Sequence, residues 1–264
     1  MKFKPNRERF NVLSSGGGTQ SNAIICLIHA GILPKPDLII MADTEREMPN
    51  VFEYQKKHIQ PLCDDMGVKY HIAKKSDWTH WDLYDKKGIT FPGFFTEWNG
   101  RKDNGDCNKQ PGFCSGKWKT EVTRKFLNNH YPEQVKNGVD SWIGFTVDEL
   151  RRVRTPIGKW QNRYPLIDLR MTRHDCIRYV EKYGLPTPPR SSCWMCPNRK
   201  NHEWLDMKIN QPETFQTACA FEREIQRENP HLWLHQKGIP LSEVDFTGHD
   251  QQQDLFCSNG ACFT

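Results

Sequence analysis

The chain has 264 residues, of which 26% are charged, and a formal net charge of +5. This length is enough for one large α/β domain or for one domain with an appendage, and we expect the second arrangement. The charge suits a polyanionic ligand but is too small to establish nucleic-acid binding. The sequence has no run of eighteen apolar residues and its N-terminus lacks the apolar core of a signal peptide. We therefore expect a cytoplasmic protein without a membrane span.

Short apolar runs alternate with longer segments of helical periodicity. Strands are predicted at residues 12–15, 38–42, 68–73 and 141–145. Helices are predicted at residues 19–29, 51–62, 119–129, 172–183, 202–209 and 212–228. The alternation predicts a three-layer α/β/α fold with a mostly parallel twisted sheet and a helical C-terminal extension. The expected domains are a nucleotide-binding α/β domain at residues 1–190 and a cysteine-containing helical extension with a mobile tail at residues 191–264.

One predicted strand ends in three glycines and polar residues just before the first predicted helix. Glycines let the backbone approach an anion closely, and the amides at a helix N-terminus attract negative charge. A glycine-rich turn without a ligand is the alternative for this segment taken alone. The residues of this candidate phosphate-binding loop are Ser15, Gly16, Gly17, Gly18, Thr19, Gln20 and Ser21.

Polar and charged residues follow two further strands. Asp43 ends the second predicted strand, and ligands of open parallel sheets bind at the carboxyl ends of strands. It is therefore a candidate to hold a nucleotide, with a helix N-cap as an equally supported role. The last predicted strand leads to Arg151, Arg152 and Arg154, whose guanidinium groups suit phosphates and sulfates. We expect these arginines to include anion clamps, and at least one of them to be only a solvated surface residue.

The ten cysteines are expected to serve metal binding or catalysis more often than disulfides in a reducing compartment. Cys193 and Cys196 can hold one ion or cluster from a single turn. Cys107 and Cys114, in the irregular segment 78–113, are candidates to complete a tetrahedral zinc site or a [4Fe-4S] site. A thioredoxin-like redox pair is the alternative for Cys193 and Cys196, but no matching βαβ context surrounds them.

Two further cysteines, Cys257 and Cys262, lie in a polar C-terminal tail. An exposed thiol on a mobile tail can move to a bound substrate, so both are candidate catalytic nucleophiles. Additional metal ligation and simple end-of-chain thiols are the alternatives. The cysteines within predicted helices are expected to be small core residues.

In their order, these segments resemble the adenine-nucleotide α-hydrolase, or PP-loop, superfamily and within it the phosphoadenosine phosphosulfate reductase family. The likeness covers most of residues 10–200. Its motifs are the glycine-rich loop, Met-Ala-Asp-Thr-Glu around Asp43, Ile-Gly-Phe-Thr-Val-Asp-Glu-Leu-Arg-Arg at 143–152, Pro-Leu-Ile-Asp at 165–168 and Gly-Leu-Pro at 184–186. Cys114, Cys193 and Cys196 look like the cysteines of adenylylsulfate reductases and of cluster-containing ATP pyrophosphatases of DNA sulfur modification. The block at 192–204 is similar to uncharacterised, often phage-encoded, members.

The resemblance implies an adenine-nucleotide-binding enzyme of sulfur metabolism that reduces a sulfonucleotide to sulfite through a cysteine thiol. It also implies a [4Fe-4S] cluster, with zinc as the alternative, and a thioredoxin-like reductant. A second hypothesis is an iron–sulfur-dependent ATP pyrophosphatase that uses Mg²⁺ and activates a nucleic acid or a small molecule. A third is a zinc-stapled nucleic-acid-binding protein without catalysis. A homodimer is left open.

Three features depart from the family patterns. ATP pyrophosphatases of this superfamily carry an Asp after the glycines, whereas Thr19 and Gln20 stand here. Adenylylsulfate reductases have adjacent cysteines where Cys107 and Cys114 are seven positions apart. The tail also lacks the Glu-Cys-Gly type of ending found in the reductases. The missing Asp favours a sulfonucleotide over ATP as the substrate.

Overall fold

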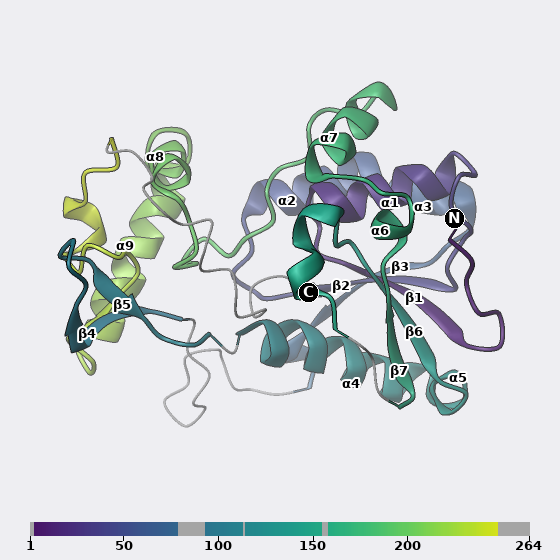
Figure 1. Ribbon diagram of the computed structural model, residues 1–264, viewed down its shortest axis with the longest axis horizontal. Coiled ribbons are helices and arrows are strands. Elements are labelled where there is room, and N and C mark those ends of the chain that lie inside the picture. The colour runs from purple at the N-terminus through teal and green to yellow at the C-terminus, as the bar shows by residue number, and fades with distance from the viewer. Residues whose placement is uncertain (1–2, 79–92, 113, 155–157, 248–264) are drawn as a thin grey trace. The chain divides into compact units, whose positions relative to one another are not determined.

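The computed structural model describes residues 3–78, 93–112, 114–154 and 158–247 (Figure 1). These residues divide into two compact units. The first unit combines residues 3–78, 116–154 and 158–191, and the second combines residues 93–112, 114–115 and 192–247. The domain division expected from the sequence, at residue 190, assigns residues 93–112 to the first domain. The structure groups this segment with the second unit instead. No helix in the described ranges is both long and apolar enough to cross a membrane.

A five-stranded parallel sheet with the order β3-β2-β1-β6-β7 forms the centre of the first unit. Its strands are β1 (Phe10–Ser15), β2 (Leu38–Asp43), β3 (Tyr70–Lys74), β6 (Val139–Ile143) and β7 (Trp160–Arg163). The chain builds outward from β1 to β3 and then returns to β6 on the other side of β1. The strand order therefore reverses at β1, which is where ligands bind in open α/β sheets.

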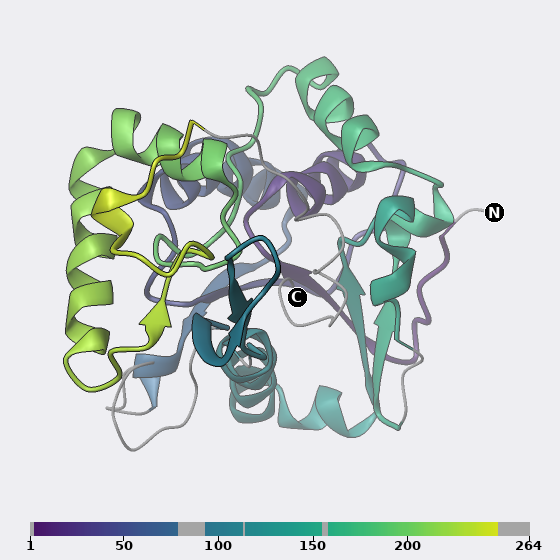
Figure 2. The same cartoon turned by 60° about the vertical axis from the view of Figure 1, so that its left-hand side comes forward.

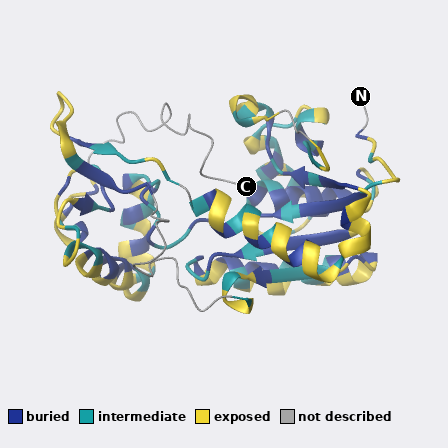
Figure 3. Ribbon diagram, turned by 90° about the horizontal axis from the view of Figure 1, so that it is seen from below, coloured by how far each residue is buried: buried dark blue, intermediate teal, exposed yellow. Residues whose placement is uncertain are grey.

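Helices cover both faces of this sheet, which confirms the predicted three-layer α/β/α fold (Figure 1). Successive strand residues point to opposite faces, so Leu13 and Ile39 pack with α1 whereas Val12 and Ile40 pack with α4. Figure 3 shows the strands buried and exposed residues on the helices. One face carries α1 (Thr19–His29), α2 (Pro49–Tyr54), α3 (Gln60–Met66), α6 (Pro165–Asp168) and α7 (Arg173–Lys182), and the other carries α4 (Glu121–His130) and α5 (Pro132–Lys136).

The second unit contains a small antiparallel sheet and two helices. The sheet has the order β5-β4-β8, with β4 (Phe95–Arg101), β5 (Cys107–Lys109) and β8 (Leu232–Trp233). The helices are α8 (Asn201–Asn210) and α9 (Pro212–Gln226). β4 pairs with β8 through Phe95 with Trp233 and Thr96 with Leu232, and Figure 2 shows the unit that contains them turned toward the viewer. We expected the segment 78–113 to be irregular. Its described part instead forms a hairpin, whose strands pair with each other and with β8, which is distant in sequence.

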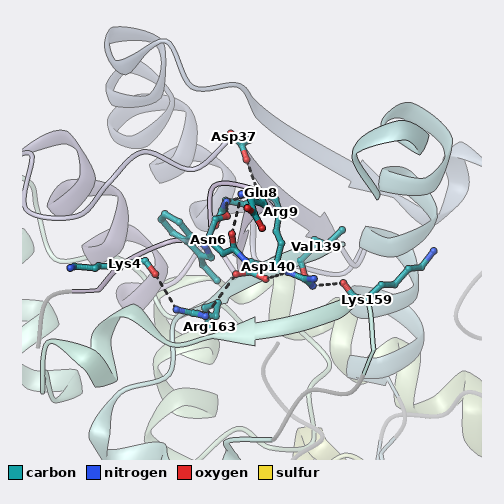
Figure 4. A network of polar contacts seen from close by, with 11 residues as sticks. Lys4, Asn6, Glu8, Arg9, Asp37, Val139, Asp140, Lys159 and Arg163 are labelled. Atoms are coloured by element: carbon teal, nitrogen blue, oxygen red, sulfur yellow. Dashed lines mark hydrogen bonds and ion pairs between the residues drawn. The ribbon is translucent and has the colours of Figure 1, made fainter. Parts of the chain in front are cut away.

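A buried ionic network closes the amino-terminal edge of the parallel sheet (Figure 4). Asp140, at the start of β6, is fully buried and accepts a close hydrogen bond from Arg9 Nε. The same guanidinium donates to the carbonyl oxygens of Val139 and Lys159, at 3.1 and 2.6 Å from Nη2. Gly138 has a φ of +94°, and a Cβ at that position would collide with the guanidinium. Arg9 therefore fills space that only a glycine leaves open.

Candidate functional site

The predicted phosphate-binding loop lies at the carboxyl end of β1 and leads directly into α1. Gly17 has a φ of +73°, and a Cβ there would lie 2.8 Å from Val51 Cγ1 and 2.9 Å from Met41 Cε. Both the backbone angle and the packing therefore require glycine. The N-cap of α1 is Gly18, which has no side chain to accept from the first helical amides, and the first turn of α1 contains no acidic residue. Such an N-terminus favours an anion.

Two buried side-chain amides hold the loop carbonyl of Gly17 inward. Asn22 Nδ2 donates to this oxygen at 3.2 Å, and Gln55 Nε2 donates at 3.0 Å. Tyr70 in turn donates from its hydroxyl to Gln55 Oε1 at 3.0 Å. Asn22 and Gln55 are fully buried. A carbonyl that is bonded toward the protein interior does not repel an anion at the loop, so this network supports anion binding.

The serine hydroxyls of the loop also bond within the loop. Ser15 Oγ accepts a hydrogen bond from Gly17 N at 3.1 Å, and Ser21 Oγ donates to the Gly18 carbonyl at 3.0 Å. The Ser21 hydroxyl hydrogen is therefore used by the backbone in this conformation. The backbone amides of the loop are the better candidates for donors to an anion.

A segment from the far end of the first unit packs on the loop. A Cβ at Gly18 would lie 3.3 Å from Ser191 Cβ, so the two backbones approach closely. Ser191 Oγ donates to Glu47 Oε2 at 2.8 Å, while Glu47 Oε1 accepts from Met48 N at 3.1 Å. Ser191 and Glu47 are both buried. This hydroxyl–carboxylate contact fixes residue 191 against the loop.

Asp43 ends β2 at the same sheet edge as the loop, and its side chain is buried. Burial raises the pKa of its carboxyl, while a hydrogen bond from Glu45 N at 2.6 Å and the Lys74 ammonium 3.7 Å away oppose that rise. Glu45 has a φ of +57°, so the chain turns sharply after the strand. Asp43 is thus a buried carboxyl group at the end of the strand next to β1, and its role in holding a nucleotide stays a prediction.

The segment after β6 contacts the loop from the other side. A Cβ at Gly144 would lie 3.2 Å from Gln20 Cβ and 3.3 Å from Ser21 N. Gln20 Nε2 donates to Glu149 Oε2 at 3.2 Å. Glu149 forms a close ion pair with Arg152, whose guanidinium lies 4.2 Å from the Phe145 ring centre. Glu149 therefore links the loop to Arg152.

The three candidate clamp arginines differ in their surroundings. Arg152 is engaged with Glu149 and Phe145, so it positions Glu149 in this conformation. Arg151 and Arg154 are exposed. The backbone of Arg154 is held by the Tyr164 hydroxyl, 3.1 Å from Arg154 N. Anion binding by Arg151 and Arg154 stays a prediction.

The cysteine pair of the second unit forms a tight turn. Cys196 N donates to the Cys193 carbonyl at 3.0 Å, and both residues are half-buried. Arg199 is buried, donates from Nη2 to the carbonyls of Ser192 and Cys193 at 3.3 and 3.2 Å, and lies 5.6 Å from the Trp204 ring centre. Two thiols on one turn fit zinc or iron–sulfur ligation, and a nearby guanidinium would favour a negatively charged metal–thiolate group.

The other two proposed ligands lie in the same unit. Cys114 is half-buried at the start of a helical segment. Cys107 in β5 is fully buried, burial raises the pKa of its thiol, and a Cβ at Gly238 would collide with its Sγ. Across the described ranges no three His, Cys, Asp or Glu side chains are placed to hold one ion, and no disulfide is formed. The four-cysteine set stays a prediction.

Two predicted site residues, Cys257 and Cys262, lie outside the described residues, and several residues that contact the loop were not predicted. Gly144 and Glu149 belong to the motif at 143–152 that the sequence analysis selected, although their contacts with the loop were not predicted. Sequence patterns gave no reason to select the other residues that shape the loop, which are Asn22, Glu47, Gln55 and Ser191.

The sequence matches no known family model and no curated protein. Among solved structures, it is similar to phosphoadenylyl-sulfate (PAPS) reductase from Candida auris in a phosphate complex, with 14% identity and a TM-score of 0.43 over 70% of this chain and 81% of the other. It is also similar to the U34-tRNA thiolase NcsA from Methanococcus maripaludis with its [4Fe-4S] cluster, with 14% identity and a TM-score of 0.45 over 84% and 74%. At these TM-scores, neither likeness supports a conclusion about activity.

Proposed function

We propose that the chain binds an adenine nucleotide through residues 15–21 and acts on a sulfonucleotide. The observation that carries the proposal is the inward-held Gly17 carbonyl, because it leaves an uncapped helix N-terminus facing the point where the strand order reverses. The sequence resemblance supplies the adenine nucleotide and the sulfur chemistry. In this proposal Asp43 accepts hydrogen bonds from the nucleotide, and Arg151 and Arg154 are the candidate anion clamps.

The proposed reaction uses a thiol of the C-terminal tail. The thiolate of Cys257 or Cys262 attacks the sulfonate sulfur, so that an S–S bond forms and the sulfur–oxygen bond to the nucleotide phosphate breaks. The nucleotide leaves with that oxygen as part of its phosphate. A second thiolate, from a thioredoxin-like dithiol, then attacks the cysteine sulfur and releases sulfite. The sulfur of the sulfonucleotide gains two electrons, and the tail cysteine and the first thiol of the reductant are oxidised to a mixed disulfide. The second thiol of the reductant then attacks this disulfide and releases the tail cysteine as a thiol.

The proposed metal group belongs to the cysteines of the second unit. Cys193 and Cys196 would hold it from one turn, with Cys114 and Cys107 as the further candidate ligands. A zinc ion at this pair would stabilise the turn, whereas a [4Fe-4S] cluster would also supply a redox centre. Anaerobic purification followed by iron, sulfide and zinc analysis distinguishes the two. The double variant C193S/C196S should lose the metal, whereas C219S, at a buried cysteine of α9, should keep it. Equal metal content in both variants would contradict the assignment.

Replacement of both tail cysteines tests the reaction. The variant C257S/C262S should release no sulfite from adenylylsulfate or its 3′-phosphorylated form, and should retain the nucleotide affinity of the wild type. The single variants C257S and C262S then identify the nucleophile. Sulfite release by the double variant at the wild-type rate would exclude this mechanism, while leaving nucleotide binding by the loop as a separate result.

Glu149 favours one second candidate, an ATP pyrophosphatase. Its carboxylate accepts a hydrogen bond from Gln20, which with Thr19 stands where ATP pyrophosphatases carry an Asp after the glycines. Glu149 and Asp43 are suitable oxygen ligands for the Mg²⁺ that would balance a triphosphate. Pyrophosphate release from ATP with Mg²⁺ and a nucleic-acid or small-molecule acceptor, lost in E149Q, would support this candidate. Sulfite release without ATP would support the sulfonucleotide reaction.

A further inference from the structure

A cationic cleft lies beside the third strand of the parallel sheet. It has a volume of about 190 Å³ and is lined by residues that follow β3, by Lys117 in the helical turn Gly116–Thr120 and by residues of α4. Because β1 and β3 are parallel and only β2 separates them, their carboxyl ends lie about 10 Å apart. The cleft is therefore at the loop-bearing edge of the sheet but is built from other residues. Its lining is Lys75, Trp78, Lys117, Glu121, Val122 and Lys125.

The charges of the lining favour an anion. Three ammonium groups and one carboxylate give the cleft a net charge of +2. Lys117 Nζ pairs with Glu121 Oε1 at 2.6 Å, which neutralises one cation in part. Lys75 and Lys125 carry the remaining positive charge. A compact ammonium group binds phosphate as a point charge.

Aromatic rings hold two of these ammonium groups in place. Lys75 Nζ lies 4.5 Å from the centre of the Trp118 ring, which is buried. Lys125 Nζ lies 5.6 Å from the centre of the half-buried Trp78 ring. Cation–π contacts of this kind orient a flexible side chain. The buried Val122 side chain adds an apolar part to the lining.

The size of the cleft limits its ligand. Pockets for whole small molecules typically enclose about 300–1,000 Å³. A cleft of about 190 Å³ is too small for a complete nucleotide but has room for one charged group. We infer that this lysine cleft binds a phosphate group of a ligand other than the nucleotide held by residues 15–21. The source is a phosphodiester strand or a free phosphate, and the experiment below separates them.

The test measures binding of a fluorescein-labelled single-stranded oligonucleotide to the full chain by anisotropy, as a function of salt. The variant K117Q/K125Q removes two ammonium groups of the cleft and keeps Lys75 over Trp118. Each lost phosphate contact on a single strand should reduce the slope of log affinity against log salt by about 0.7. Because the cleft holds one phosphate group, the double variant should lower the slope by about 0.7 and the affinity at 0.15 M salt by about fourfold.

A matched control removes two exposed lysines elsewhere in the first unit. K136Q/K182Q changes the net charge equally, and Lys136 pairs with Glu133 much as Lys117 pairs with Glu121. This control should retain the slope, and adenine-nucleotide affinity should be unchanged in both variants. Equal losses in the two variants, or no loss in K117Q/K125Q, would overturn the inference.

Calorimetry with inorganic phosphate and pyrophosphate forms the second arm. If the oligonucleotide does not bind but pyrophosphate does, and K117Q/K125Q removes one pyrophosphate site that K136Q/K182Q keeps, the cleft is a site for free phosphate. If neither probe distinguishes the cleft variant from the control, the cleft is not a phosphate site. Phosphate and pyrophosphate can also bind the loop at residues 15–21, but K117Q/K125Q leaves that loop unchanged, so only the binding that this variant loses is assigned to the cleft. The thiols take part in neither arm, so failure here is separable from failure of the proposed reaction.

Discussion

The two edges of the parallel sheet are made from the same strands but differ in chemistry. At the amino edge, the charge of Asp140 is met by Arg9, and the Arg9 guanidinium also donates to two carbonyl groups (Figure 4). At the carboxyl edge, the loop has a glycine N-cap, and the buried Asp43 carboxyl has a pKa raised by burial. At the first edge, Asp140 Oδ1 and the Arg9 guanidinium are bonded within the protein, and Asp140 Oδ2 has the Arg163 guanidinium 3.9 Å away. The second edge keeps groups that can bond to a ligand.

This difference separates residues that hold the fold from residues that hold a ligand. Removal of a partner from a bonded buried charge costs stability and should not change ligand affinity. A change at the ligand edge should instead alter affinity, and a destabilising feature there can be removed with a gain in stability. Three variants test this separation.

The largest expected effect is on stability, from Arg9→Ala at the amino edge. The variant leaves the Asp140 carboxylate buried without its closest cation, which typically costs about 3–5 kcal/mol. Urea unfolding measures the loss, and nucleotide affinity under native conditions should be unchanged. Arg7→Ala is the control, since the exposed Arg7 makes only a 3.4 Å bond to the Lys35 carbonyl and should cost less than about 0.5 kcal/mol. Equal destabilisation by both would remove the distinction between the edges.

Gly17→Ala at the carboxyl edge should reduce both stability and nucleotide affinity. The backbone angle costs about 1–2 kcal/mol for a side chain, and the contacts with Val51 and Met41 add to this. Displacement of the loop should weaken nucleotide binding by at least about tenfold, measured by calorimetry. Gly31→Ala is the matched control: its φ is +71°, but a Cβ there has nothing within 4 Å. Gly31→Ala should lose about 1 kcal/mol of stability and retain nucleotide affinity. If both variants lost affinity equally, backbone strain rather than contact with the ligand would explain the loss.

The smallest effect is expected from Asp43→Asn, and it depends on pH. Since burial raises the pKa of Asp43 above its ordinary value of 3.8, the folded protein ionises this group less readily than the unfolded chain does. Wild-type stability should therefore fall relative to the variant as pH rises from about 3.8, until the folded carboxyl is fully ionised. Unfolding at several pH values should show D43N to be more stable at neutral pH, with weaker nucleotide binding. A variant that is less stable at neutral pH would indicate that Asp43 stabilises the fold.

The sequence predicts the central layers well because local patterns determine them. The helix expected at 19–29 and the strands expected around Val12 and Leu38 carry apolar residues that are buried in the structure. The edge strand β7 (Trp160–Arg163) was missed because all of its residues are half-buried and three are polar. The β4–β5 hairpin was missed for a different reason. Its sequence lacks regular alternation, and part of its pairing is with β8, more than 120 residues later.

The site divides in the same way. Glycines, Asp43 and the cysteine pair are visible in the sequence because their residue types and spacing are unusual. The partners of the loop are ordinary residues, such as Gln55 and Ser191, which reach it only after the helices and the chain end of the first unit have packed. The role expected of Arg152 also depends on a neighbour, because Glu149 already engages its guanidinium.

The buried amides around Gly17 have a consequence for the rate of ligand capture. Asn22 and Gln55 fix the loop carbonyl through the folded core, so the loop needs no rearrangement when an anion arrives. The conformational entropy of ordering this segment is lost during folding rather than at the encounter. Association with the nucleotide should therefore follow a single phase that is first order in nucleotide up to high concentration, and differences in affinity among loop variants should appear mainly in the dissociation rate.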